Sequence, residues 1–305
     1  MTQIRESRLR ASTAHKMNDG DPGVMKTDPW FATKLDSVDD VPEPMRGALV
    51  EKVPSYKSIR LLVHAPDVST EQEGPPISAT LLAVTNDGWL VVSESEEGDV
   101  SVDGCKFDDT LFLELTSLIL WGELKIHFAS VGTSYCAAAR FNTVTEELYR
   151  EAIDLLLDGI DQAPAQGAPK DDENATSIFE NWPIEFRTEA LLYRPKLQRI
   201  LAVTRWPSLV DALRRPVCPA GALLVTEREL VLISEEKTTG DIGVIIYFPL
   251  VRLRDFHVSH QQRLGVLALE AHAKRGAERL EILFPADYAN ALSKAMGRAF
   301  DTAGY

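Results

Sequence analysis

Two histidines three residues apart, His257 and His260, could form part of a metal site, because imidazole nitrogens are common zinc ligands. On the β-strand expected here, residues i and i+3 point to opposite faces, so the two imidazoles diverge. No cysteine or carboxylate lies at a spacing that would complete a site. We interpret both as ordinary strand-end residues and predict no metal.

The three cysteines, Cys105, Cys136 and Cys218, are scattered along the chain. Cys136 lies in an apolar run, where a cysteine is most often a small core residue. The sequence has no nucleophile elbow, no glycine-rich phosphate loop and no helix with a glutamate between two histidines. We therefore expect no enzymatic activity, no catalytic residue and no cofactor.

The same features predict the compartment. Three unevenly spaced cysteines are typical of a reducing environment. The first eight residues are polar and do not resemble a secretory signal. The longest uncharged apolar runs, such as 242–251, reach about ten residues, against the roughly 18 that a membrane-spanning helix needs. We predict a cytoplasmic protein without a transmembrane segment.

Charge is distributed unevenly along the 305 residues. The chain has 46 acidic and 32 basic side chains, and this formal net charge of −14 argues against a nucleic-acid partner. Residues 1–160 hold 27 acidic and 14 basic side chains, whereas residues 181–305 hold 14 acidic and 17 basic ones. Part of this basic excess lies in Arg194, Lys196, Arg199, Arg205, Arg214 and Arg215.

Two segments contain little that could pack into a core. Residues 1–28 are polar and predict a disordered N-terminal arm. Residues 161–180 combine proline, glycine, alanine and acidic side chains, and they predict a linker between domains. We therefore expect a first domain at 29–160 and a second at 181–305, each long enough to bury its own core.

The two halves are copies of one another. With a shift of 141 residues, positions 59–94 match positions 200–235 without a gap and with nine identities. Phe107 matches Phe248 on the same shift, and beyond it the shift becomes 143. A match that preserves order and needs one two-residue adjustment indicates a tandem duplication.

Each copy predicts the same run of elements: a tight hairpin, a further strand, a second hairpin and a closing amphipathic helix. The predicted elements are 81–85, 89–93, 107–120, 123–129, 135–141 and helix 146–160 in the first copy, and 222–226, 230–234, 247–258, 265–271, 279–284 and helix 287–300 in the second.

The opening hairpin has four apolar residues, a threonine, two or three turn residues and four apolar residues that end in Ser-Glu. This pattern resembles the signature hairpin of bacterial PH-like and GRAM-like domains. The resemblance covers roughly 46–160 and 186–302. In the second copy, Thr226 and Arg228 fall where such domains commonly have threonine and arginine, whereas the first copy has Asp-Gly in the turn.

The resemblance implies a mainly β (α+β) fold of two bent antiparallel β-barrels, each capped by one C-terminal α-helix. It also implies that loops near the first strand can hold anionic headgroups, so the six basic residues named above are the expected phosphate site. The alternative is a solvated basic face, or a face that docks onto the acidic first copy. A net charge of −14 opposes an anionic leaflet, which disfavours peripheral lipid contact.

Aromatic residues precede each copy: Trp30 and Phe31 the first, Trp182 and Phe186 the second. They could fasten the preceding segment to its barrel, or they could dock onto the other copy or another chain. We predict a non-enzymatic interaction or scaffold protein that acts through protein–protein contact or self-association. The alternative is a sensor of anionic lipids or phospholigands that uses the basic loops of the second domain.

Overall fold

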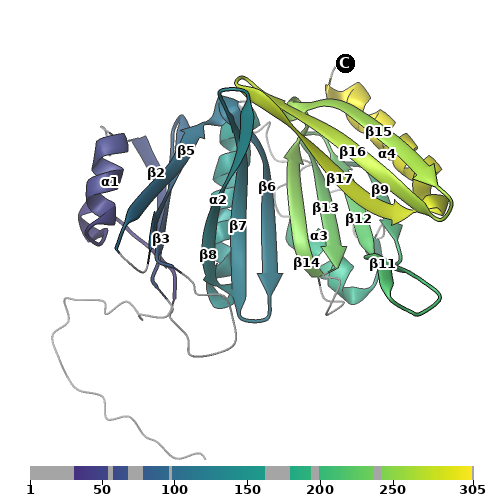
Figure 1. Ribbon diagram of the computed structural model, residues 1–305, viewed down its shortest axis with the longest axis horizontal. Helices are drawn as coiled ribbons and strands as arrows, with labels where there is room; N and C mark the ends of the chain where they lie inside the picture. Colours follow the sequence, from purple (N-terminus) through teal and green to yellow (C-terminus); the bar gives the residue numbers. More distant parts are fainter. Residues whose placement is uncertain are drawn as a thin grey trace, which may run out of the picture.

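The computed structural model describes residues 31–53, 58–67, 78–95, 98–161, 179–193, 199–235 and 242–303. These residues form a mainly β structure of antiparallel sheets with four α-helices (Figure 1). The predicted arm at 1–28 and most of the predicted linker at 161–180 lie outside the described residues.

The first copy begins with a five-stranded sheet whose strands follow one another in sequence order. Helices α1 (Met45–Lys52) and α2 (Glu146–Asp161) cover its two faces, which explains why β3 is buried along its whole length. The strands of this sheet are β1 (Thr33–Lys34), β2 (Ile59–Ala65), β3 (Thr80–Thr85), β4 (Gly88–Glu94) and β5 (Val100–Lys106). The first copy continues with the 3-10 turn η3 (Phe107–Asp109) and the strands β6 (Thr110–Leu118), β7 (Trp121–Ser130) and β8 (Thr133–Asn142).

The second copy contains helices α3 (Ile184–Tyr193) and α4 (Ala289–Ala303). Its strands are β9 (Ile200–Trp206), β10 (Leu209–Val210), β11 (Pro216–Cys218), β12 (Gly221–Thr226), β13 (Glu229–Glu235), β14 (Ile242–Pro249), β15 (Leu253–Gln261), β16 (Leu264–Ala273) and β17 (Gly276–Pro285). A 3-10 turn, η8 (Leu250–Arg252), separates β14 from β15, so the single strand predicted over 247–258 is wrong. Pro249 lacks the N–H that a continuous strand would need there.

The elements of the two copies recur in register. Strands β2, β3 and β4 begin 141 residues before β9, β12 and β13, and every element from η3 to α2 begins 143 residues before its equivalent from η8 to α4. The two-residue difference therefore falls between β4 and η3. Phe107, the first residue of η3, corresponds to Leu250 rather than to Phe248.

The largest sheet runs through both copies. Its seven strands have the order β8-β7-β6-β14-β13-β12-β9, so β6 of the first copy pairs with β14 of the second (Figure 1). The two barrels expected from the sequence are not found: the described strands form open sheets and no closed barrel. Periodicity within a strand identifies its buried face but not its neighbour, because an open strand edge can pair with any other.

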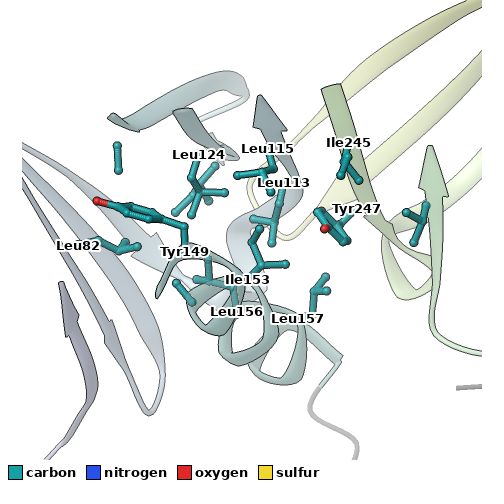
Figure 2. Packing of buried hydrophobic residues seen from close by; sticks show 14 of the residues in the cluster. Leu82, Leu113, Leu115, Leu124, Tyr149, Ile153, Leu156, Leu157, Ile245 and Tyr247 are labelled. Atoms are coloured by element: carbon teal, nitrogen blue, oxygen red, sulfur yellow. The ribbon is translucent and has the colours of Figure 1, made fainter. Parts of the chain in front are cut away.

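The hydrophobic core also crosses between the copies. Helix α2 buries Tyr149 and Ile153 in a cluster that includes Leu82 of β3 and Leu113 of β6. Tyr247, on β14 of the second copy, belongs to the same cluster and is 2% exposed (Figure 2). The first copy's helix therefore packs on residues of both copies.

A glycine lies opposite a buried phenylalanine in each copy, Gly122 opposite Phe141 and Gly265 opposite Phe284. A Cβ atom at Gly265 would overlap the ring of Phe284, which is fully buried and cannot move aside. We expect Gly265→Ala to lower the free energy of unfolding by about 1–3 kcal/mol, measured by urea denaturation.

The control is Gly297→Ala on α4, where an added Cβ atom meets nothing within 4 Å. It should leave stability unchanged or raise it by up to about 1 kcal/mol, because alanine is the better helix former. Equal stability of Gly265→Ala and the wild type would contradict the tight contact.

Candidate interaction site

The basic residues predicted as a phosphate site are spread over the second copy. Arg199 directly precedes β9 and Arg205 lies near its end, about 20 Å away at the usual rise per strand residue. Arg214 and Arg215 lie in the turn between β10 and β11, where the Arg215 guanidinium pairs with Asp211 at 2.8 Å. Arg194 and Lys196 lie outside the described residues. The four described arginines therefore do not converge on one anion.

The aromatic residues predicted for docking lie against the core. Phe186, on α3, is 1% exposed in the cluster shared by the copies. Trp182 packs against that cluster, and its ring meets Phe179 edge to face at 4.9 Å. Phe31 is half-buried just before β1, and Trp30 lies outside the described residues. Phe186 and Trp182 thus fasten α3 to the core.

Opposite charges of the two copies meet inside the chain. The Arg228 guanidinium of the second copy pairs with Asp158 at 3.2 Å and with Asp161 at 2.5 Å, both on α2. Arg252 donates hydrogen bonds to the carbonyl oxygens of Phe107 and Thr110. The charge complementarity noted in the sequence therefore serves, at these residues, contact between the copies.

One further contact joins β7 to β17. His127 Nδ1 lies 3.1 Å from Glu278 Oε1, and Glu114 Oε2 lies 3.9 Å from His127 Nε2. Burial lowers the pKa of His127, but contacts with Cys136 and Glu278 outweigh burial and raise the pKa to about 9. Cys136 is exposed beside His127, not in the core as the sequence predicted, because Ala137, Ala139 and Phe141 take the core face of β8 and Cys136 lies on the opposite face.

An open groove lies between β9 and α4. Strand β9 is the last strand of the seven-stranded sheet, and no described strand pairs with its outer edge. Two neighbouring hollows of about 410 and 350 Å³ lie along it. The groove residues are Arg199, Ile200, Leu201, Ala202, Val203 and Thr204 at β9, and Ala291, Lys294, Ala295, Arg298, Asp301 and Thr302 on α4.

Backbone hydrogen-bonding groups and cations line this groove. Arg298 Nη1 donates to the carbonyl oxygen of Leu201 at 2.6 Å. Lys294 and Arg298 are exposed on α4, and Arg199 is exposed at the start of β9. Asp301 is the acidic residue among the groove residues. The groove therefore combines an open strand edge, an apolar floor and an excess of positive charge.

The equivalent edge in the first copy is occupied. Strand β1 pairs antiparallel with β2, with Lys34 opposite Val63, and the Leu35 N–H donates to the Leu62 carbonyl at 2.9 Å. At a shift of 141, Leu62 corresponds to Val203, and the two residues hold the same register against their neighbouring strands. By this equivalence, the Val203 carbonyl faces away from β12, toward the position where the first copy adds a strand.

Sequence reasoning identified Arg199 but missed Lys294 and Arg298. The available signal was the repeat: at a shift of 143, Lys294 and Arg298 correspond to Glu151 and Leu155, both changes of charge on the closing helix. In the described part of the chain, no group of three or more His, Cys, Asp or Glu side chains could hold a metal ion. No helix there is long and apolar enough to cross a membrane.

No known protein family and no curated protein matches this chain.

Proposed function

We propose that this chain is a non-enzymatic interaction protein, built from two PH-like copies, that binds an extended segment of a partner protein along β9. Each copy is a run of antiparallel strands closed by an amphipathic helix, which supports the PH-like assignment. One observation carries the function: among the described residues, no strand pairs with β9 at the edge where the equivalent β2 carries β1. Strand addition of this kind derives its affinity from main-chain hydrogen bonds.

Three features support binding at β9. The groove beside it has an apolar floor, which gives an added strand a surface to bury. Helix α4 supplies a second wall, as α2 does for β1 through the Lys34–Glu151 ion pair. An unpaired strand edge can accept a further strand through its free main-chain groups, and this edge lies beside a groove in which that strand would be buried.

The test uses two fluorescein-labelled peptides with the sequence of residues 31–37, one native and one with Lys34→Glu. Both peptides copy β1, the strand that covers β2. They should not displace β1 from the β2 edge, because tethering gives β1 an effective concentration in the millimolar range. We expect fluorescence polarisation to show binding of at least one peptide to the full chain, with a dissociation constant below about 1 mM.

Val203→Pro should weaken this binding at least about tenfold. In an antiparallel pair, a residue whose carbonyl points outward also points its N–H outward, and proline removes that donor. Val203→Ala, which keeps the backbone donor, is the matched control, and thermal unfolding shows that both variants stay folded. Absence of binding for both peptides, or equal binding to the proline variant, would overturn the proposed function.

A further inference from the structure

The strand that covers β2 is held by an ion pair whose counterpart in the second copy has the opposite sign. Lys34 Nζ on β1 lies 2.6 Å from Glu151 Oε1 on α2, and both side chains are about half exposed. At the shift of 143 that relates α2 to α4, Glu151 corresponds to Lys294. Lys294 is exposed in the groove beside β9. A strand bound in this groove with a lysine at the position equivalent to Lys34 would place that lysine against the like charge of Lys294.

Two other differences between the closing helices give the β9 groove more space and more positive charge. Leu148 and Leu155 of α2, which pack against the core, correspond to Ala291 and Arg298 of α4. The smaller alanine leaves space, and the hollow here is about 410 Å³. Arg298 adds a second cation one turn beyond Lys294. With Arg199, three cations face one carboxylate, Asp301, along this edge.

We propose that the β9 groove binds an acidic extended segment of a partner protein, with a carboxylate side chain where the first copy's covering strand has Lys34. This rests on the proposed function and names the chemistry of its partner. The segment pairs with the Val203 edge, its carboxylate lies against Lys294, and an apolar side chain follows at the position of Leu35. Exchanging the ends of a Lys–Glu pair keeps its total length, so the carboxylate reaches Lys294 across the same gap.

The charge preference has a definite size. Each exposed ion pair changes affinity by a factor of about two to five and is screened by salt. We expect the Lys34→Glu peptide to bind the wild-type chain about fivefold or more tightly than the native-sequence peptide. This ratio should fall towards one at 0.5 M salt, because the groove cations are exposed.

The decisive variant is Lys294→Glu in the full chain, which restores the charge of the first copy. The order of the two peptides should reverse, with the native Lys34 peptide now the tighter ligand. Lys274→Glu is the matched control: it changes the net charge equally, but Lys274 is exposed in the turn between β16 and β17. It should leave the wild-type order unchanged.

The outcomes separate the two proposals. Equal binding of both peptides to the wild type and to Lys294→Glu would overturn the acidic partner and leave strand addition standing. Absence of binding for both peptides would overturn the proposed function itself. Light scattering provides the last result: a wild-type dimer that Lys294→Glu converts to monomer would assign the groove to a second copy of this chain and overturn the partner proposed here.

Discussion

Tyr247→Ala is expected to lower the free energy of unfolding of the whole chain by about 3–5 kcal/mol, the usual cost of deleting a large buried ring. Tyr247 is 2% exposed and packs in the core that α2 shares with both copies (Figure 2). Because β6 and β14 belong to one sheet, we expect one cooperative transition that moves as a unit in urea, followed by circular dichroism and by tryptophan fluorescence.

Tyr135→Ala is the matched control. Tyr135 lies on β8 of the same sheet and is 51% exposed, so its loss should cost at most about 1 kcal/mol. Two separate transitions, with only the second-copy transition shifted by Tyr247→Ala, would contradict a shared core.

Glu229→Gln is expected to remove a large pH dependence of stability. Burial, together with the nearby charges of Asp161 and Asp158, raises the pKa of Glu229 to about 8 from its ordinary 4.5. The unfolded chain releases this proton near pH 4.5, but the folded chain keeps it to about pH 8. The contribution of Glu229 to the free energy of unfolding is therefore fully present below pH 4.5. It is lost as the pH rises to 8, by on the order of 4 kcal/mol. Glutamine, which stays neutral, avoids this loss.

The measurement is the free energy of unfolding of Glu229→Gln and of the wild type at several values between pH 4 and pH 9. The two curves should be close at pH 4 and should separate towards pH 8, with the variant the more stable. Glu227→Gln changes an exposed residue of the same turn and should follow the wild type. Parallel curves for Glu229→Gln and the wild type would show that Glu229 ionises normally in the folded chain.

Features set by local periodicity could be predicted from the sequence. The closing helices predicted at 146–160 and 287–300 are confirmed as Glu146–Asp161 and Ala289–Ala303. The opening hairpins are confirmed too, because their apolar runs flank tight turns. Helix α1 was missed because it makes about two turns and buries only Met45 and Leu49, too few positions to show a period.

The candidate site could be predicted only in part. The repeat alignment already placed Lys294 opposite Glu151, but that difference has no meaning until Lys34 is known to pair with Glu151. Pairing between β1 and β2 involves only two residues of β1, which show no alternation in the sequence. Likewise, nothing in the sequence of β14 indicates that β6 is its neighbour. The backbone N–H and C=O groups that join the two strands are the same in every sequence.

The pairing of β6 with β14 has a consequence for how this duplicated gene can change. Copies that fold separately can be lost, exchanged or recombined one at a time. Here, removal of the second copy would expose the β6 edge and the face of α2 that packs on Tyr247, and removal of the first would leave β14 without its neighbour. We therefore expect the two halves to be inherited together, and a substitution at their shared boundary to affect the folding of both.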